Sequence, residues 1–187
     1  MDLLHIVDPN LKNFVKCVER TLKWEGGFVD NPNDPGGRTN KGITQKEYDR
    51  YRQEKAEATQ DVKDISDDEV VEIYYNNYYL QVHSELFEAD IKVQWKVFDI
   101  GVNMGVSRAM RFVQTIIGTV PDGQFGPNSQ MKLAAYKLNS NWSSLMMQSL
   151  VNLQTQKYKD LATNNPKLQV FLKGWLRRAA DIGDGLV

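Results

Sequence analysis

Apolar residues recur at steps of three and four along most of this chain, the spacing that places them on one face of an α-helix. The first such segment is residues 11–24, and the same spacing predicts about eight helices in all. The others span residues 44–58, 67–79, 90–104, 107–117, 128–138, 141–162 and 166–180. Alternating apolar and polar residues are confined to short stretches within 27–43. The pattern therefore predicts a mainly α fold with at most one small β-hairpin, near residues 27–43.

The segment after the first helix is rich in turn-forming residues, and a single glutamate stands at its start. Glu25 closes the helical pattern and is followed by Gly26 and Gly27. We expect these glycines to end the helix, because glycine accepts the left-handed conformation that is common at helix C-termini. The run NPNDPGG, residues 31–37, then predicts tight turns. Glu25 is thus expected to lie between a rigid helix and irregular backbone.

The composition allows a stable core without metal ions or disulfide bonds. The chain has 187 residues, 41% of them hydrophobic, which is enough for one core or for a core divided into two lobes. The single cysteine, Cys17, cannot pair within the chain. The two histidines, His5 and His83, form no recognisable arrangement with it. We therefore expect no metal site, no cofactor and no nucleophilic cysteine.

The formal net charge of −1 conceals an uneven distribution. Residues 1–95 carry 12 Lys and Arg against 19 Asp and Glu, whereas residues 96–187 carry 11 against 5. We expect an acidic front lobe over 1–95 and a basic helical rear lobe over 96–187, joined by the apolar helix at 90–104. The basic half would orient the protein on an anionic polymer, although a solvated surface explains the same charges equally well. Nucleic acid is not expected as a partner, because no nucleic-acid-binding motif accompanies the scattered basic residues.

Neither a membrane span nor a signal peptide is expected. No run approaches the roughly 18 apolar residues that a transmembrane helix needs. Residues 1–10 lack both a basic start and an apolar core. We therefore expect a protein made in the cytoplasm, without stable membrane insertion, that leaves the cell only by another route such as lysis or a membrane pore.

Glu25 and the turns after it offer residue types that suit hydrolysis of a glycosidic bond. That reaction needs a protonated carboxylic acid against the leaving oxygen and a second group that attacks the sugar or orients a water molecule. Glu25 fits the first role, and Asp34 and Thr39 would face it if residues 27–43 fold back as a hairpin. Taken alone, Asp34 is better explained as a turn residue than as a catalytic one. Glu25 is explained equally well as an ordinary residue at a helix end.

Taken together, these positions form a longer motif. Glu, Gly-Gly-aromatic and Asn-x-x-Asp-Pro-Gly-Gly-x-Thr-x-x-Gly-Ile-Thr follow one another from Glu25 to Thr44. This order is similar to the N-terminal motif of glycoside hydrolase family 108, which comprises bacterial and phage N-acetylmuramidases. The spacing of Glu, Asp and Thr also resembles that of phage-type lysozymes of glycoside hydrolase family 24. In the rear half, FDIGVNMGVSRAMRFVQTIIG, PDGQFGPNS and FLKGWLRRA resemble the companion region usually described as a predicted peptidoglycan-binding domain.

The resemblance implies a lysozyme-like, two-lobed helical fold and a reaction. The reaction is cleavage of the β-1,4 bond between N-acetylmuramic acid and N-acetylglucosamine in peptidoglycan, whose glycan strands would be the partner. Glu25 carries over as the general acid. Asp34 and Thr39 carry over as groups that orient water or stabilise positive charge on the sugar.

The same resemblance assigns roles to the two halves of the chain. Residues 1–95 would form the catalytic lobe, and residues 96–187 would form either a peptidoglycan-binding region or the second lobe of one compact domain. We expect a monomeric phage endolysin. Two other functions fit the same residues: a non-catalytic wall-binding protein, in which Glu25 is structural, and a lytic transglycosylase, which uses one acidic Glu and leaves an anhydro sugar.

Two residues near Glu25 are further candidates for contact with the sugar. Trp24 is the aromatic residue best placed to shape the site, because it directly precedes Glu25. Asp30 is the main competitor of Asp34 for the second acidic role.

Four candidates lie farther along the chain. Asp99 and Asn103 are four residues apart on one predicted helix, so they share a face that would line the floor of a cleft. A cap or a bridge between neighbouring loops is the alternative for both. Gln114 and Tyr78 are expected to contact sugar hydroxyl or acetamido groups, with core packing as the alternative for the aromatic Tyr78.

Overall fold

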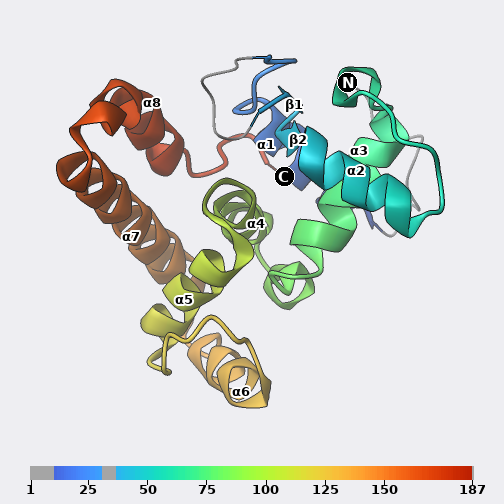
Figure 1. Ribbon diagram of the computed structural model, residues 1–187. Helices are drawn as coiled ribbons and strands as arrows, with labels where there is room; N and C mark the ends of the chain where they lie inside the picture. Colours follow the sequence, from blue (N-terminus) through green and yellow to red (C-terminus); the bar gives the residue numbers. More distant parts are fainter. Residues whose placement is uncertain (1–10, 31–36, 187) are drawn as a thin grey trace. The chain divides into compact units, whose positions relative to one another are not determined.

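The structure, a computed structural model, describes residues 11–30 and 37–186, which form eight α-helices and one two-stranded antiparallel sheet (Figure 1). The mainly α fold with a small hairpin is thereby confirmed. Within the described residues, no helix is long and apolar enough to cross a membrane. The elements are α1 Lys12–Leu22, β1 Thr39–Asn40, β2 Ile43–Thr44, α2 Gln45–Glu54, α3 Asp67–Tyr74, α4 Ile91–Met104, α5 Val106–Ile117, α6 Pro127–Tyr136, α7 Trp142–Asn164 and α8 Gln169–Ala180. Short helical turns occupy Val62–Asp64, Tyr75–Tyr79, Ser84–Phe87 and Pro166–Leu168.

The contacts within the chain divide it into two compact units. We call Met1–Asn77 the first unit and Tyr78–Val187 the second unit. The division falls inside the π-helical turn that extends α3, Tyr75–Tyr79. The expected boundary between the lobes, after residue 95, lies within α4 and so inside the second unit.

In the first unit, α1 packs its apolar face against α3. The buried residues of α1 follow the helical spacing, and Phe14 meets Tyr75 edge to face with ring centroids 5.1 Å apart. Cys17 is fully buried in this face and is not part of a disulfide bond. The hydrophobic effect thus holds α1 in place, and with it the start of the segment that carries Glu25.

Side-chain caps begin two helices of this unit. Ser66 and Glu69 form a complete capping box at the start of α3, in which each side chain accepts from the other residue's backbone N–H. Thr44 accepts from the backbone N–H of Glu47 at 3.2 Å and so caps α2. Both helices therefore begin where the sequence predicted.

The hairpin turns on two residues with positive φ. Asn40 pairs with Ile43, and the turn between them consists of Lys41 and Gly42, with φ of 50° and 77°. Two positive φ values define a type I′ turn, whose twist matches that of the flanking strands. On the other side of Thr39, Val29 pairs with it through a single antiparallel bridge. The paired strands are therefore shorter than the hairpin expected over residues 27–43.

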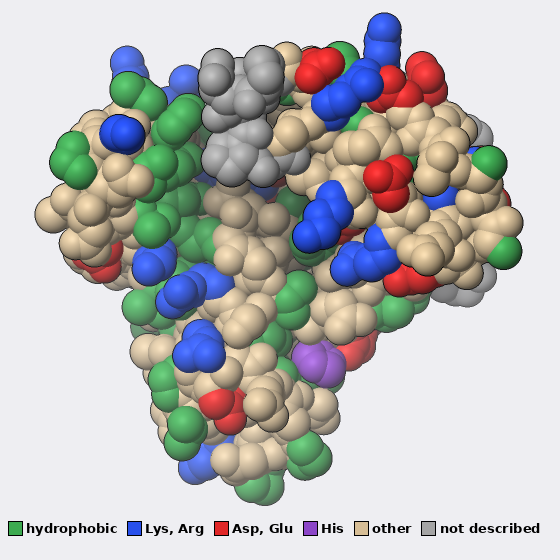
Figure 2. Space-filling model, in the orientation of Figure 1, with side chains coloured by type: hydrophobic (Ala, Val, Ile, Leu, Met, Phe, Trp, Pro, Cys, Tyr) green, Lys and Arg blue, Asp and Glu red, His purple; other side chains and the backbone are tan. Residues whose placement is uncertain are grey.

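Two parallel sets of charged side chains join α2 to α3. Glu69 accepts hydrogen bonds from the Tyr48 hydroxyl at 2.8 Å and from Arg52 at 2.6 Å. One turn farther along each helix, Glu72 accepts from the Tyr51 hydroxyl at 2.8 Å and from Lys55 at 2.5 Å. Acidic and basic side chains accordingly lie beside one another on the surface of this part of the first unit (Figure 2).

In the second unit, α4 is the central helix, with an unbroken buried run from Val93 to Gly101. It packs against α5 and α7, and α7 packs in turn against α8. The buried run includes two charged residues, Lys96 and Asp99, both of which bond to the end of α8. Burial of paired charges in this position ties α8 to the core of the unit.

Candidate active site

Glu25 lies in the turn after α1, three residues beyond the last helical residue. The helix ends at Leu22, and the next two backbone N–H groups, of Lys23 and Trp24, still bond to carbonyls of its last turn. Neither Gly26 nor Gly27 has a positive φ, so the expected left-handed ending is absent from this described turn. The Glu25 side chain is half-buried. This placement confines the carboxyl group without removing it from solvent.

The hairpin turn packs directly against the Glu25 side chain. A Cβ atom added at Gly42 would lie 3.1 Å from both Cγ and Cδ of Glu25, and 2.6 Å from the Tyr74 hydroxyl oxygen. The Tyr74 hydroxyl donates to the carbonyl of Lys41 at 2.9 Å, which fixes the turn. Gly42 thus has a positive φ and no room for a side chain. The Glu25 side chain packs against the backbone at this position.

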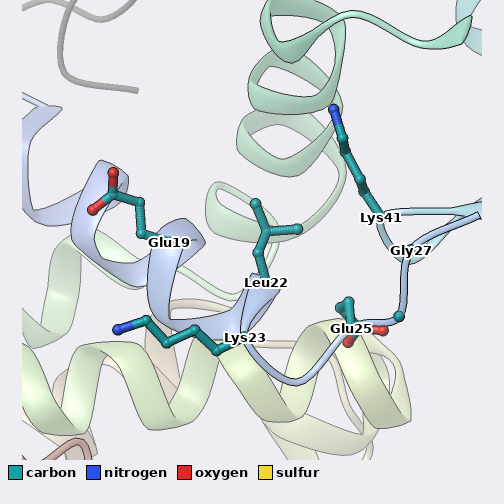
Figure 3. Close-up of a pocket in the computed structure, with 7 residues that line it drawn as sticks. Glu19, Leu22, Lys23, Glu25, Gly27 and Lys41 are labelled. Atoms are coloured by element: carbon teal, nitrogen blue, oxygen red, sulfur yellow. The ribbon is translucent and has the colours of Figure 1, made fainter. Parts of the chain in front are cut away.

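A pocket of about 460 Å³ opens in front of this turn (Figure 3). Figure 3 shows Glu25 beside Gly27 on one side and Glu19 with Lys23 on the α1 side, with Leu22 between them. The lining residues are Glu19, Leu22, Lys23, Glu25, Gly26, Gly27 and Lys41. A carboxyl group in the wall of an open pocket has the access that a general acid needs.

The pocket has charged residues that the sequence did not single out. Glu19 lies on α1 and Lys23 is the C-cap residue four positions later, so the helical spacing places the two on one face. Lys41 projects from the hairpin turn, and its ammonium group pairs with Asp67 at 2.6 Å. Its place in the pocket depends on the type I′ turn. Asn-Gly is a strong sequence signal for that turn, whereas Lys-Gly is not.

Thr39 occupies the middle row of the small sheet. Its backbone exchanges two hydrogen bonds with Val29, of 2.8 and 3.0 Å, and its hydroxyl donates to the carbonyl of Gly37 at 3.2 Å. Thr39 is half-buried and does not line the pocket among the residues described. Asp34 lies outside the described residues. The roles predicted for Asp34 and Thr39 therefore stay predictions.

Asp30 is exposed and belongs to a charged cluster around Arg38. The Arg38 guanidinium lies 3.5 Å from the Asp30 carboxylate and 2.5 Å from that of Asp61, and it stacks over the Phe28 ring at 5.3 Å. Asp30 does not line the pocket among the residues that the structure describes, and its predicted part in the second acidic role stays a prediction.

Trp24 and Tyr78 are both half-buried, and neither lines the pocket within the part of the chain that is described. Trp24 lies in the turn between α1 and Glu25, with its backbone bonded to Thr21 at 2.9 Å. Tyr78 lies in the π-helical turn and is the first residue of the second unit. Their predicted contacts with sugar are not tested by this geometry.

Asp99 and Gln114 have structural partners that occupy their polar atoms. Asp99 is 0% exposed and accepts two hydrogen bonds from Arg178, of 2.8 and 3.1 Å. Gln114 is 1% exposed; its amide nitrogen donates to Asp122, Gln124 and Ser129, while its oxygen accepts from the backbone of Gly123. For Asp99, this pairing favours the bridging alternative, because buried polar groups are normally satisfied by internal partners. The predicted contact of Gln114 with sugar stays a prediction.

Asn103 differs from Asp99 although the two share α4. It is exposed, accepts a hydrogen bond from the Tyr158 hydroxyl, and lines a separate pocket in the second unit. No group of three or more potential metal ligands occurs among the described residues.

Comparison with known proteins agrees with the motif. Residues 18–105 match the family described as glycosyl hydrolase 108, and residues 108–180 match one described as a predicted peptidoglycan domain. No curated protein matches the chain. Among solved structures, that of Brucella abortus SagA is similar, with 25% sequence identity, a TM-score of 0.71 and 89% of each chain covered. The front part of the chain is therefore similar to glycosyl hydrolase 108, and the part that follows is similar to a predicted peptidoglycan domain.

Proposed function

We propose that this protein is an N-acetylmuramidase that hydrolyses the β-1,4 bond between N-acetylmuramic acid and N-acetylglucosamine in peptidoglycan. One observation carries the proposal: the half-buried carboxyl group of Glu25 forms part of the wall of an open pocket. Glu25 also lies within the segment that matches glycosyl hydrolase 108. The match of residues 108–180 to a predicted peptidoglycan domain supports the wall polymer as substrate.

In the proposed reaction, Glu25 donates a proton to the glycosidic oxygen as the bond to the sugar breaks. Positive charge develops on the sugar ring in the transition state, and a water molecule completes the hydrolysis. We assign the orientation of this water to Asp34 with help from Thr39. Glu25 is suited to the acid role because packing against the Gly42 turn fixes its side chain while one side of it meets solvent.

The test compares Glu25→Gln with Glu19→Gln. Both residues line the same pocket, and both substitutions replace a carboxyl group by an amide of nearly the same shape. Release of reducing ends from purified cell walls should fall about 100-fold or more in Glu25→Gln, because a general acid typically contributes that much. The Glu19→Gln variant should keep its activity, and both should unfold at the wild-type temperature. Full activity of Glu25→Gln would remove it from the acid role.

Product analysis separates hydrolysis from the two alternatives. A muramidase yields a reducing N-acetylmuramic acid end, whereas a lytic transglycosylase yields an anhydro end that is lighter by one water molecule. A wall-binding protein without activity would sediment with walls and release neither product. Mass spectrometry of the soluble fragments therefore distinguishes all three functions in one measurement.

We extend the proposal to a phage endolysin that is made in the cytoplasm and reaches the wall once the membrane is opened. Cells that express the protein should then lyse only after a membrane-permeabilising agent is added. Lysis without such an agent would contradict this delivery route.

A further inference from the structure

The second unit contains a pocket of about 380 Å³ that the catalytic proposal does not use. It is formed by the C-terminal end of α4, the first turn of α5, the last turns of α7 and the middle of α8, helices that can be followed in Figure 1. Its polar lining comes from Asn103, Arg108, Lys157, Tyr158 and Trp175. All of these residues belong to the second unit, so the pocket is defined by that unit alone.

Two cations in this pocket have no counterion. Arg108 and Lys157 are both half-buried, and neither makes an ion pair or a side-chain hydrogen bond with any residue that the structure describes. The lining includes no acidic residue. Two neighbouring cations without a carboxylate raise the local potential and favour an anionic ligand.

The amide of Asn103 is oriented by its neighbours. The Tyr158 hydroxyl accepts from the amide of Gln154 at 3.3 Å and donates to the side-chain oxygen of Asn103. With its oxygen engaged, Asn103 has its two amide N–H groups left to offer. Asn103 therefore adds two N–H donors to the pocket.

Trp175 is fixed by ring stacking. Its ring lies 5.2 Å from that of Tyr158 at 21° and 5.8 Å from that of Phe171 at 27°. The indole N–H is a donor only, and it has no partner among the described residues. The pocket thus combines a guanidinium, an ammonium, an amide N–H₂ and an indole N–H, and each of these groups donates.

We propose that this pocket binds a carboxylate of the peptidoglycan stem peptide, next to the N-acetylmuramoyl unit that carries it. Two cations and two further N–H donors, without a carboxylate in the lining, favour an oxyanion as ligand. The preference for an oxyanion comes from the donors alone, and the choice of a carboxylate as that oxyanion comes from the substrate. The choice of a muramyl peptide as its source rests on the proposed function.

The experiment measures dissociation constants for small soluble probes by calorimetry, with the full-length Glu25→Gln variant to prevent turnover. The probes are muramyl dipeptide, N-acetylmuramic acid, N-acetylglucosamine and inorganic phosphate. Muramyl dipeptide should bind at least about tenfold more tightly than uncharged N-acetylglucosamine. Tighter binding of N-acetylmuramic acid than of the dipeptide would move the assignment to the lactyl carboxylate, and tighter binding of phosphate would overturn the carboxylate.

Two double variants with equal changes in net charge locate the site. Arg108→Gln with Lys157→Gln removes the pocket cations, whereas Arg111→Gln with Lys159→Gln removes neighbouring cations on the same two helices that do not line the pocket. Affinity for muramyl dipeptide should fall about tenfold in the first variant and stay unchanged in the second. Equal losses in both would overturn the pocket as the site.

A measurement on the unsubstituted pocket guards against folding defects. The indole N–H resonance of Trp175 should shift on addition of muramyl dipeptide, whereas the indole N–H resonance of buried Trp95 should not. A silent Trp175 resonance would contradict the proposal. Because these readouts concern binding, they can fail while cell-wall cleavage succeeds, and they can succeed while cleavage fails.

Discussion

At the scale of single residues, Gly42 links the backbone of the hairpin to the carboxyl group of Glu25. Its φ of 77° is one that an L-residue adopts at a cost, and the added Cβ of alanine would press on both Glu25 and Tyr74. We predict that Gly42→Ala lowers the free energy of unfolding by about 1 to 3 kcal/mol. It should also lower cell-wall hydrolysis, because Glu25 must move to make room. Chemical denaturation and an assay of reducing ends measure the two effects.

Gly27→Ala is the matched control for this prediction. Gly27 lines the same pocket, has no positive φ, and would place its added Cβ more than 4 Å from any neighbour. Its substitution should change stability little. Similar losses in both variants would show that Gly42 has no special role.

Lys96 gives a second prediction at this scale. Its ammonium group is 0% exposed and donates to the carbonyls of Arg178, Ala179 and Asp181 at 3.3, 2.8 and 3.0 Å. Burial lowers the pKa of Lys96 to about 8, although the nearby negative charges of Asp99 and Asp181 act to raise it. The end of α8 is thus held by a cation whose charge is costly to bury.

The direction of the resulting pH dependence follows from linkage. The unfolded lysine has a pKa of 10.5, so between pH 8 and pH 10.5 the unfolded chain binds more protons than the folded one. The free energy of unfolding should therefore rise with pH in this window, by up to about 3 kcal/mol from this group. Urea unfolding of the wild type and of Lys96→Met at pH 7.5 and 9.5 isolates the effect. A difference between the two proteins that does not change with pH would contradict it.

At the scale of elements, the two charged sets between α2 and α3 look alike but differ in burial. The side chains of Glu69 and Arg52 are 16% and 14% exposed, whereas those of Glu72 and Lys55 are both 40% exposed. Glu69 also completes the capping box of α3 with Ser66. Exposed ion pairs contribute little, because water screens them and their side chains lose freedom on pairing.

We predict that Glu69→Ala destabilises the first unit by about 2 to 3 kcal/mol, and that Glu72→Ala costs about 1 kcal/mol or less.

Burial would raise the pKa of Glu69, but hydrogen bonds from Ser66, Tyr48 and Arg52 outweigh it and lower the pKa below 4.5. Its contribution is present above pH 4.5 and is lost as pH falls through the lowered value. Denaturant titrations at pH 7 and pH 3 test both statements, and equal costs for the two variants would refute the ranking.

The elements also show which features of the fold could be read from the sequence. Helices such as α4, and caps such as Ser66 with Glu69, depend on residues three to four apart, so their spacing predicts them. The partner of Asp99 is Arg178, 79 residues later, and no local pattern distinguishes that buried pair from a ligand-binding face. Asn103, one turn away on the same helix, lines a pocket separate from that of Glu25, and its spacing from Asp99 did not reveal the donors around it.

The candidate active site divides in the same way. Glu25 was found because the glycines and the turn motif after it are local signals. Lys41 reaches the pocket only through the type I′ turn, whose geometry depends on tertiary packing. The helical spacing gives the face of α1 on which Glu19 lies, but it does not show that this face borders a pocket.

At the scale of the whole molecule, the distribution of charge bears on how the protein reaches its polymer. Residues 96–187 carry 11 Lys and Arg against 5 Asp and Glu, and the wall presents carboxylates. We predict that binding of the Glu25→Gln variant to purified walls weakens several-fold between low salt and roughly 0.5 M salt, because added ions screen exposed charges. Sedimentation with walls measures the bound fraction. Walls whose carboxylates have been converted to amides should bind less protein at low salt and lose the salt dependence. A bound fraction that changes with neither salt nor amidation would mean that uncharged contacts alone hold the protein on the glycan.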